Sequence, residues 1–167
     1  GKAPRPDEAG YPAYMNFVRK YATSEEAHQL FYKYVNFILN RTNRYTHRKY
    51  VDDPAIMSWQ IGNEPRAFGK EELEPFVKWL SEASSLIRSI DKNHLVSIGS
   101  EGAWGCEGDY NVYEKICADK NIDYCNVHLW PYNWGWAKKD SLIENLDRSC
   151  RNTKEYIDRH LTICSKL

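Results

Sequence analysis

Three long stretches of the chain place apolar residues at intervals of three and four, the spacing of an amphipathic helix. The first follows Thr23 and Glu26, which fit a capping box, and predicts a helix from about 24 to 43 with an inner face of Ala27, Leu30, Phe31, Tyr34 and Ile38. The second, Lys70 to Ile90, tolerates Pro75 in its first turn and carries a stripe of Leu73, Phe76, Val77, Leu80, Ile87 and Ile90. The third predicted helix covers Leu142 to Cys164.

Three shorter stretches have the length and composition of β-strands: Ala55 to Gly62, Leu95 to Gly99 and Ile122 to Trp130. Before the last of them, Asp109 is placed to cap a short helix whose inner face is Val112, Tyr113 and Ile116. Strands that alternate with helices imply parallel pairing through right-handed crossovers, so the predicted class is α/β. Residues 1–22, with several prolines and tyrosines, are expected to form a long irregular segment.

The two faces of each predicted strand differ in polarity. One face is apolar, as with Val96 and Ile98 in the second strand. The other face is polar or small: Ser58, Gln60, Gly62 and Glu64 in the first strand, Ser97, Gly99 and Glu101 in the second, and Tyr124, Asn126, His128 and Trp130 in the third. A doubly wound sheet buries two apolar faces, whereas a (β/α)8 TIM barrel turns one face inward, so the asymmetry favours part of a barrel.

Composition and charge narrow the possible partners. A length of 167 residues fits a single domain or a part of one. Lys plus Arg and Asp plus Glu both number 23, so no net field attracts nucleic acid or an acidic membrane. No apolar run approaches the roughly 18 residues that a membrane-spanning helix needs. The five cysteines form no CxxC pair and no metal-ligand spacing, so the sequence specifies neither a disulfide framework nor a metal site.

Side chains that could take part in chemistry end the polar face of each predicted strand. Glu64 ends the first, Glu101 the second, and His128 with Trp130 the third. Taken singly, each has a structural explanation: a turn, a helix cap, a buried core histidine. Their convergence on the carboxyl-terminal rim, where barrel active sites are built, favours a catalytic site. Pro65 disfavours the α region for Glu64 and helps hold its carboxylate at the mouth.

The segment HLWPYNWGW, His128 to Trp136, is the most aromatic stretch of the chain. Flat rings stack on the C–H faces of sugars, and indole N–H groups and amides bond hydroxyls. We expect Trp130 to contact a ligand, while Trp134 and Trp136 fit equally a ligand contact or a packed loop. No GxGxxG, GxxxxGK[ST] or GxSxG motif is present, so no nucleotide cofactor and no serine nucleophile is indicated. His94 is expected in a solvated turn.

The segment YTHRKYVDDPAIMSWQIGNEPR, Tyr45 to Arg66, resembles the fourth-strand region of the endo-β-1,4-mannanases of glycoside hydrolase family 5, which are retaining (β/α)8 glycosidases. The resemblance continues through VSIGSEGAWG (96–105) at the fifth strand and NVHLWPYNWGW (126–136) at the sixth. It implies that residues 1–167 form a single partial domain, the central segment of a catalytic barrel with about strands 4 to 6.

The resemblance also implies roles for individual residues. Glu64 would be the general acid/base, with Asn63 beside the 2-hydroxyl of the sugar, and His128 and Trp130 along the cleaved bond. Many related enzymes have tyrosine at the position of Trp130. Arg66 and Glu101 match positions that contact sugar on the leaving-group side, and we add Trp134 to the predicted substrate-binding residues. The family's nucleophile is a glutamate at the end of the seventh strand, which we expect to lie outside this chain.

The expected partners are therefore a polysaccharide or oligosaccharide substrate and the remaining segments of the barrel, with no cofactor. A polymeric substrate implies an extracytoplasmic enzyme. Two alternatives remain open at this stage. One is a related β-glucanase or cellulase, because the acid/base apparatus does not choose the sugar epimer. The other is a non-catalytic glycan-binding module that keeps the aromatic rim.

Overall fold

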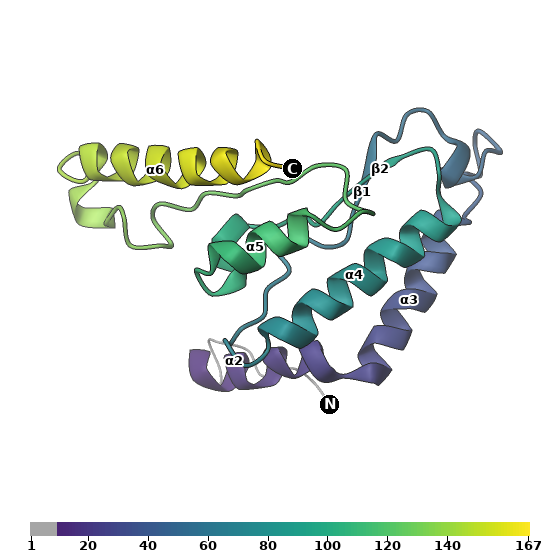
Figure 1. Ribbon diagram of the computed structural model, residues 1–167, viewed down its shortest axis with the longest axis horizontal. Helices are drawn as coiled ribbons and strands as arrows, with labels where there is room; N and C mark the ends of the chain where they lie inside the picture. The colour runs from purple at the N-terminus through teal and green to yellow at the C-terminus, as the bar shows by residue number, and fades with distance from the viewer. Residues whose placement is uncertain (1–9) are drawn as a thin grey trace.

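The computed structural model describes residues 10–167 as a succession of helices around a small parallel sheet (Figure 1). The α-helices are α2 (Tyr11–Val18), α3 (Glu25–Leu39), α4 (Leu73–Ile90), α5 (Tyr110–Cys117) and α6 (Leu146–Cys164). The strands are β1 (Ser58–Gln60) and β2 (Leu95–Ser97), and short 3-10 turns are η1 (Arg19–Thr23), η2 (Tyr50–Asp52), η3 (Gly102–Cys106) and η4 (Lys139–Ser141). Among these helices, none combines the length and apolarity needed to span a bilayer.

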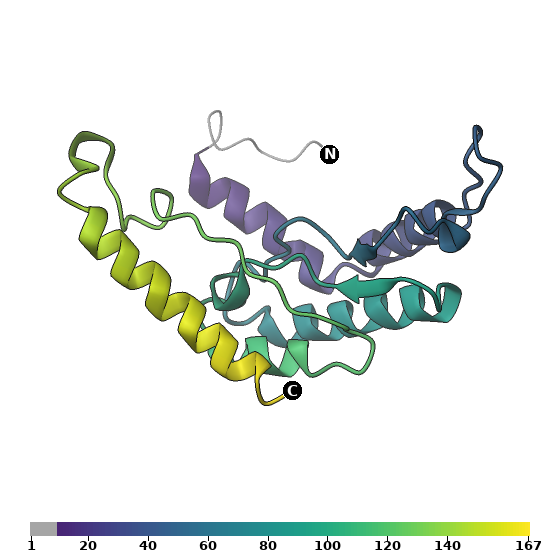
Figure 2. The same cartoon turned by 90° about the horizontal axis from the view of Figure 1, so that it is seen from above.

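The two strands run parallel, and α4 forms the connection between them. Their register pairs Trp59 with Val96. The ladder is continued past both strands, because Ile61 N–H donates to Ser97 O at 3.0 Å and Gly62 N–H donates to Ile98 O at 3.2 Å. In the turned view, α4, α5 and α6 follow one another along one side of the extended segments (Figure 2). The predicted parallel α/β order is therefore confirmed for the first two strands.

The predicted third strand, Ile122 to Trp130, does not form a strand ladder. The segment has no regular secondary structure, and within residues 10–167 only one backbone hydrogen bond joins it to β2, beside several bonds to its side chains. Asp123 accepts Val96 N–H at 2.7 Å, and its own N–H donates to Val96 O at 2.9 Å. Farther along, Asn126 Oδ1 accepts the N–H groups of Gly99 at 3.0 Å and Ser100 at 3.3 Å. Because most of these acceptors lie on side chains, the segment follows β2 without the repeated backbone pairing that defines a strand.

The first predicted elements also differ at their boundaries. Residues 10–22 were expected to be irregular but contain α2 and most of η1. Pro12 lies in the first turn of α2, where N–H groups have no acceptor within the helix, so its lack of an N–H costs no hydrogen bond. Residues 1–9 of that segment lie outside the described part of the chain. The cap of α3 is Ser24, whose side chain accepts Ala27 N–H at 3.4 Å, and not Thr23. Helix α3 ends at Leu39, earlier than predicted.

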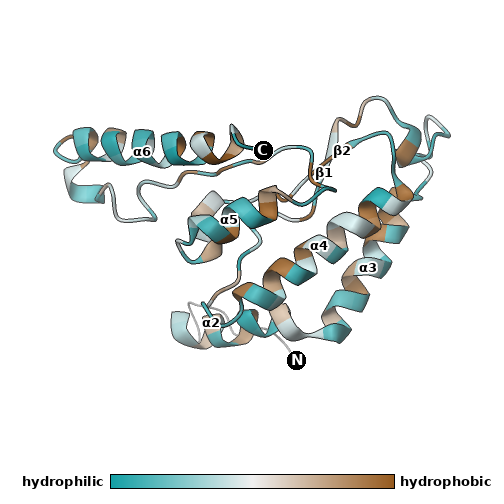
Figure 3. Cartoon of the chain, viewed as in Figure 1, coloured by the Kyte–Doolittle hydropathy of each residue, from teal (hydrophilic) through white to brown (hydrophobic). Residues whose placement is uncertain are grey.

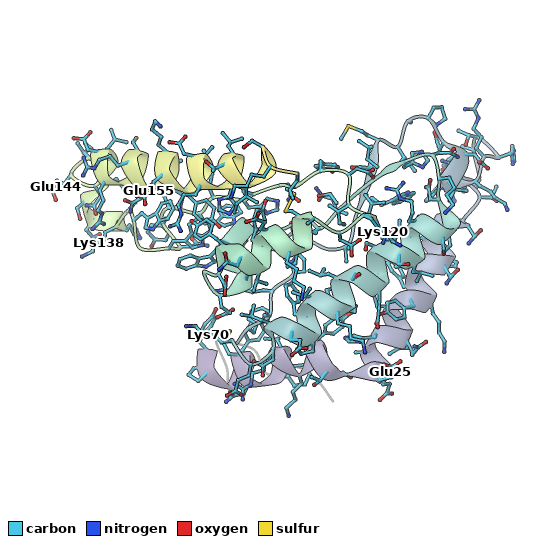
Figure 4. The ribbon with its side chains drawn as sticks, viewed as in Figure 1. Glu25, Lys70, Lys120, Lys138, Glu144 and Glu155 are labelled. Atoms are coloured by element: carbon cyan, nitrogen blue, oxygen red, sulfur yellow. A yellow bond between two sulfur atoms is a disulfide. The ribbon has the colours of Figure 1, made fainter. Side chains whose placement is uncertain are left out.

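The core lies between the helices and the sheet. Helix α4 supplies more of it than any other helix or strand, through Phe76, Trp79, Leu80, Ala83 and Ile87, which are all buried. Figure 3 shows this as an apolar face on α4, whereas α6 is mostly polar until its C-terminal end. The charged residues labelled in Figure 4, Glu25, Lys70, Lys120, Lys138, Glu144 and Glu155, are all exposed. The predicted apolar stripe of α4 is thus confirmed in the buried Phe76, Leu80 and Ile87.

The prediction for His94 is wrong, and the structure adds a disulfide on which the sequence was silent. His94 is buried and not solvated: its Nδ1 lies 2.6 Å from Asp91 Oδ2, and its Nε2 donates to Asp53 O at 3.0 Å. Asp91 is fully buried and also accepts Trp59 Nε1–H at 2.6 Å, which ties the end of α4 to β1. A disulfide joins Cys117 to Cys125, a pairing that the sequence did not specify. The predicted cap of α5 is confirmed, because Asp109 accepts the N–H groups of Asn111 and Val112.

Candidate active site

Glu64 follows β1 at the edge where both strands end. Its N–H donates to Gly99 O at 2.8 Å, and its own φ is +53°, in the left-handed region that disfavours a side chain. Gly99, at φ +80°, passes so close to Gly62 O that a Cβ would overlap this oxygen. The close approach of the two backbones therefore fixes where the Glu64 side chain starts. Such strain persists where surrounding contacts enforce it, as at ligand sites.

The carboxylate of Glu64 takes both of its side-chain hydrogen bonds on one oxygen. His128 Nδ1 lies 2.8 Å from Oε1, and Trp130 Nε1 donates to the same atom at 2.5 Å. Both donors come from the extended segment after Cys125, so the sheet edge and this segment meet at Glu64. Within residues 10–167, no hydrogen bond reaches Oε2.

Asn126 determines which His128 nitrogen carries the proton. Its Oδ1 accepts from Ser97 Oγ at 2.8 Å and from the N–H groups of Gly99 and Ser100, which requires an oxygen at that position. The Nδ2 group therefore lies on the other side, 3.3 Å from His128 Nε2, and donates to it. A neutral His128 then has its proton on Nδ1 and donates it to Glu64.

A cavity of about 600 Å3 opens beside Glu64. Aromatic side chains form much of its wall, and polar groups lie between them. The lining residues are Tyr11, Tyr14, Asn63, Glu64, Arg66, Phe68, Glu101, Trp104, Trp130, Asn133 and Trp134. Rings with interspersed polar groups suit a ligand that has apolar C–H faces and many hydroxyls.

Glu101 and Arg66 contribute opposite charges to this cavity. Glu101 is buried, and burial raises the pKa of its carboxyl group, although the Arg66 charge acts in the opposite direction. The negative charge of Glu64 adds to the increase. Arg66 Nε lies 3.5 Å from Glu107 Oε1, and the guanidinium sits over the rings of Phe68 and Trp104. Neither Arg66 Nε nor Glu107 Oε1 has a hydrogen-bond partner in the described structure.

Two tryptophans from different segments pack together at the far wall. Trp104 in η3 and Trp134 stack with ring centroids 4.8 Å apart and planes 23° apart. Trp136 instead packs edge-on against Trp134 at 5.0 Å and does not line the cavity. Of the two tryptophans whose role the sequence left open, Trp134 therefore faces the cavity and Trp136 packs behind it.

The structure brings the sequence-predicted site residues together. Six of them line the cavity, namely Asn63, Glu64, Arg66, Glu101, Trp130 and Trp134, and His128 bonds Glu64 from beside it. The sequence did not indicate Tyr11 and Tyr14, which lie in the segment expected to be irregular. Trp104 was also missed, although it lies in VSIGSEGAWG (96–105), one of the segments that resemble the family. Among residues 10–167, no group of three or more His, Cys, Asp or Glu side chains is arranged to hold a metal ion.

Comparisons with known proteins place this geometry in a family. Residues 4–167 match a model described as GH family 5 beta-mannosidase-like. The chain is 29% identical over 164 residues to a probable mannan endo-1,4-beta-mannosidase F of Aspergillus flavus, covering 87% of this chain and 33% of that protein. It is 36% identical over 114 residues to mannan endo-1,4-beta-mannosidase 4 of Solanum lycopersicum, covering 62% of this chain and 29% of that protein. The chain thus spans about a third of these relatives.

A solved structure is also similar over nearly the whole chain. The glycoside hydrolase family 5 mannosidase from Rhizomucor miehei superposes with a TM-score of 0.81 at 26% identity. The match covers 99% of this chain and 38% of that one. This similarity confirms the predicted fold class, part of a (β/α)8 barrel. The site residues lie at the carboxyl ends of its strands, the face at which barrel enzymes carry their active sites.

Proposed function

Because this chain belongs to the GH family 5 β-mannosidase-like proteins, we propose that it is part of a retaining glycoside hydrolase that cleaves internal β-1,4-mannosidic bonds in mannan, glucomannan or galactomannan. Glu64 is the general acid/base. Asn63, Arg66, Glu101, His128, Trp130 and Trp134 bind the sugar chain or hold the acid/base in place. The relatives named as mannan endo-1,4-beta-mannosidases support this substrate.

The observation that carries the proposal is the one-sided hydrogen bonding of Glu64. His128 and Trp130 both bond Oε1, so the carboxyl group is oriented, and Glu64 lines the cavity while its Oε2 accepts no hydrogen bond from residues 10–167. A general acid needs this arrangement, because one carboxyl oxygen can be fixed by the protein while the other carries a proton within hydrogen-bond reach of the leaving oxygen. A carboxylate that served only to cap a turn would be expected to accept backbone N–H groups, and Glu64 accepts none from residues 10–167.

The reaction has two displacements. In the first, a second carboxylate attacks the anomeric carbon while the glycosidic C–O bond breaks and Glu64 gives its proton to the departing oxygen, so the leaving sugar departs as an alcohol and a mannosyl-enzyme ester remains. In the second, Glu64, now ionised, removes a proton from water, which attacks the same carbon and releases the second carboxylate. Retaining enzymes set the two carboxyl groups about 5 to 5.5 Å apart. We propose that this nucleophile is a glutamate from a barrel segment outside residues 1–167.

The cavity beside Glu64 suits the sugar on either side of the cleaved bond. The stacked Trp104 and Trp134 offer a flat surface for a pyranose C–H face. The Arg66 guanidinium and the Glu101 carboxyl group both line the cavity and offer donors and an acceptor for hydroxyls. We assign these groups to substrate binding and not to bond cleavage.

Replacement of Glu64 tests the assignment directly. In the full-length enzyme, Glu64→Gln keeps the shape of the side chain but removes the exchangeable proton, so hydrolysis of unactivated mannan is expected to fall at least a thousandfold, on the order of a general acid/base contribution. Glu71→Gln, at an exposed site outside the cavity, is the matched control and should retain wild-type rates. Mannan hydrolysis that survives Glu64→Gln would remove Glu64 from the mechanism.

A substrate panel separates this function from its two alternatives. A mannanase releases oligosaccharides from mannan and glucomannan faster than from cellulose, whereas a β-glucanase reverses that order. A glycan-binding module binds without releasing any product. We also propose an extracytoplasmic location, because a polysaccharide does not cross a membrane. The disulfide between Cys117 and Cys125 supports it, since such bonds persist in oxidising compartments.

A further inference from the structure

Two buried side chains of α6 bond the backbone that follows β2. Tyr156 Oη accepts Trp104 N–H at 3.0 Å and donates to Glu101 O at 2.6 Å, so one hydroxyl closes both sides of this turn. His160 Nε2 accepts Ala103 N–H at 2.9 Å. Both side chains are buried, with exposed fractions of 7% for Tyr156 and 3% for His160. These N–H groups open η3, where a helical turn offers them no acceptor of its own.

We propose that Tyr156 and His160 are positioning residues, which hold Glu101, Trp104 and Trp134 as one rigid wall of the sugar-binding cavity. The inference deepens the proposed function and rests on it. Neither side chain lines the cavity itself. They act through the backbone of the Glu101–Trp104 turn and through the ring that Trp134 packs against.

The Tyr156 ring links the two segments that form this wall. Its centroid lies 5.1 Å from that of Trp134 and 6.1 Å from that of Trp136, while its hydroxyl bonds the Glu101–Trp104 turn. Trp104 and Trp134 stack on each other across the same junction. A single residue of α6 therefore contacts both partners of the tryptophan pair, one through its hydroxyl and the other through its ring.

His160 is held in the tautomer whose proton is on Nδ1, so its Nε2 can accept a hydrogen bond. Its Nδ1 donates to Tyr156 O at 2.6 Å within α6, which leaves the Nε2 lone pair for Ala103 N–H. Burial lowers the pKa of His160, and the charge of Arg159 acts in the same direction. Gly102, at φ +88°, is required here, because a Cβ would overlap His160 Nε2 and lie 2.8 Å from Tyr156 Oη. The contact between α6 and the turn therefore depends on two features: the missing Cβ at Gly102, and the hydrogen bonds that Tyr156 and His160 make.

The test compares binding with chemistry in the full-length enzyme. Tyr156→Phe removes only the hydroxyl, so the turn loses its two bonds and KM for mannopentaose should rise about tenfold, the effect of one or two lost hydrogen bonds. The kcat for an activated aryl β-mannoside, which depends on Glu64 and the nucleophile, should stay at the wild-type value. Tyr110→Phe is the matched control: it removes a hydroxyl from the same aromatic cluster, with its ring 6.3 Å from Tyr156, and should leave both parameters unchanged.

His160 provides a second variant pair in case Tyr156→Phe does not fold. His160→Gln keeps an acceptor near the position of Nε2 and should rescue KM, whereas His160→Leu removes it and should raise KM as Tyr156→Phe does. A purely structural role would lower the melting temperature of Tyr156→Phe and His160→Leu without raising KM. That result would overturn the inference.

A spectroscopic readout separates this inference from the proposed function. The stacked Trp104 and Trp134 contribute to near-ultraviolet circular dichroism, and subtracting the spectrum of Trp134→Phe isolates that contribution. Tyr156→Phe and His160→Leu should lose it, and Tyr110→Phe and His160→Gln should keep it. An inactive wild-type enzyme would refute the mannanase proposal, yet loss of the signal would still support positioning. An unchanged signal in Tyr156→Phe and His160→Leu would contradict it.

Discussion

The two hydrogen bonds on Glu64 Oε1 differ in what they contribute. His128 is fixed through Asn126, whereas Trp130 is half-exposed and donates from the outer side. Hydrogen bonds to a charged group contribute about 1.5 to 3 kcal/mol. Each donor therefore has a measurable effect on how Glu64 is oriented, and each can be removed separately.

Removing the Trp130 donor should slow the enzyme without abolishing its activity. Trp130→Phe keeps a ring but loses the Nε1–H bond to Glu64, so kcat/KM on mannan is expected to fall about ten- to a hundredfold in steady-state assays. Trp130→Tyr restores a donor at the position where many related enzymes carry tyrosine, and it should recover most of the loss. Equal rates for Trp130→Phe and Trp130→Tyr would show that the donor has no role.

Single residues were predictable where the pattern of strand faces marked them. Glu64, Glu101, His128 and Trp130 were found because they end polar strand faces, and the structure places them at one rim. Tyr156 and His160 could not be found this way, because the pattern of α6 indicates only that they face inward, like any other buried helix residue. His94 was misplaced for a similar reason: the turn around it is polar, but Asp91 and Asp53 O bond both nitrogens of its ring in the interior.

At the scale of elements, side chains replace backbone pairing in two places. Asp123 and Asn126 substitute for a strand beside β2, and Tyr156 with His160 substitutes for a helix cap at η3. Alternation along Ile122 to Trp130 predicted a segment that runs beside β2. Periodicity does not say whether a backbone carbonyl or a side-chain oxygen accepts each N–H group along the way. The long helices were predictable because their apolar stripes extend over several turns, and their ends differed by a few residues.

The contact between α4 and β1 should depend on pH through His94. Burial is the largest single influence and opposes protonation of His94, but the hydrogen bonds to Asp91 and to Asp53 O and the charges of both aspartates together raise the pKa of His94. A histidine whose pKa is raised on folding stabilises the protein fully below its unfolded value of about 6.5, and that stability is lost as pH rises through the folded value. The free energy of unfolding of wild type minus that of His94→Gln should therefore shrink with rising pH.

Denaturant unfolding of the full-length enzyme from about pH 6 to 9 measures this difference on either side of the ordinary histidine value. His47→Asn, at an exposed position, is the control and should leave the pH dependence unchanged. A difference between wild type and His94→Gln that stays constant over this range would show that the ion pair with Asp91 does not form.

At the scale of the whole molecule, the described structure contains two paired strands, and the similar proteins are about three times longer. Strand edges without a partner invite aggregation. The barrel class was predictable because one strand face is polar and the other apolar. The number of strands formed was not, because the third depends on side-chain bonds.

We therefore expect residues 1–167 to be unstable as an isolated chain. In scanning calorimetry the full-length enzyme should melt in a cooperative transition, and the isolated chain should aggregate or melt without one. It should also fail to bind mannopentaose, since the proposed nucleophile and the opposite wall lie elsewhere. A monomeric isolated chain that melts cooperatively and binds the oligosaccharide would contradict the partial-barrel proposal.

The role of Glu64 as acid/base is tested most directly by chemical rescue of Glu64→Ala. A dinitrophenyl β-mannobioside needs no acid to expel its leaving group, so the mannosyl-enzyme should still form and then accumulate, because no base activates water. Azide, which needs no base, should attack the anomeric carbon, break the ester and restore turnover. The account predicts a β-mannobiosyl azide product of retained configuration. Turnover that azide leaves unchanged, or an α-azide product, would contradict it.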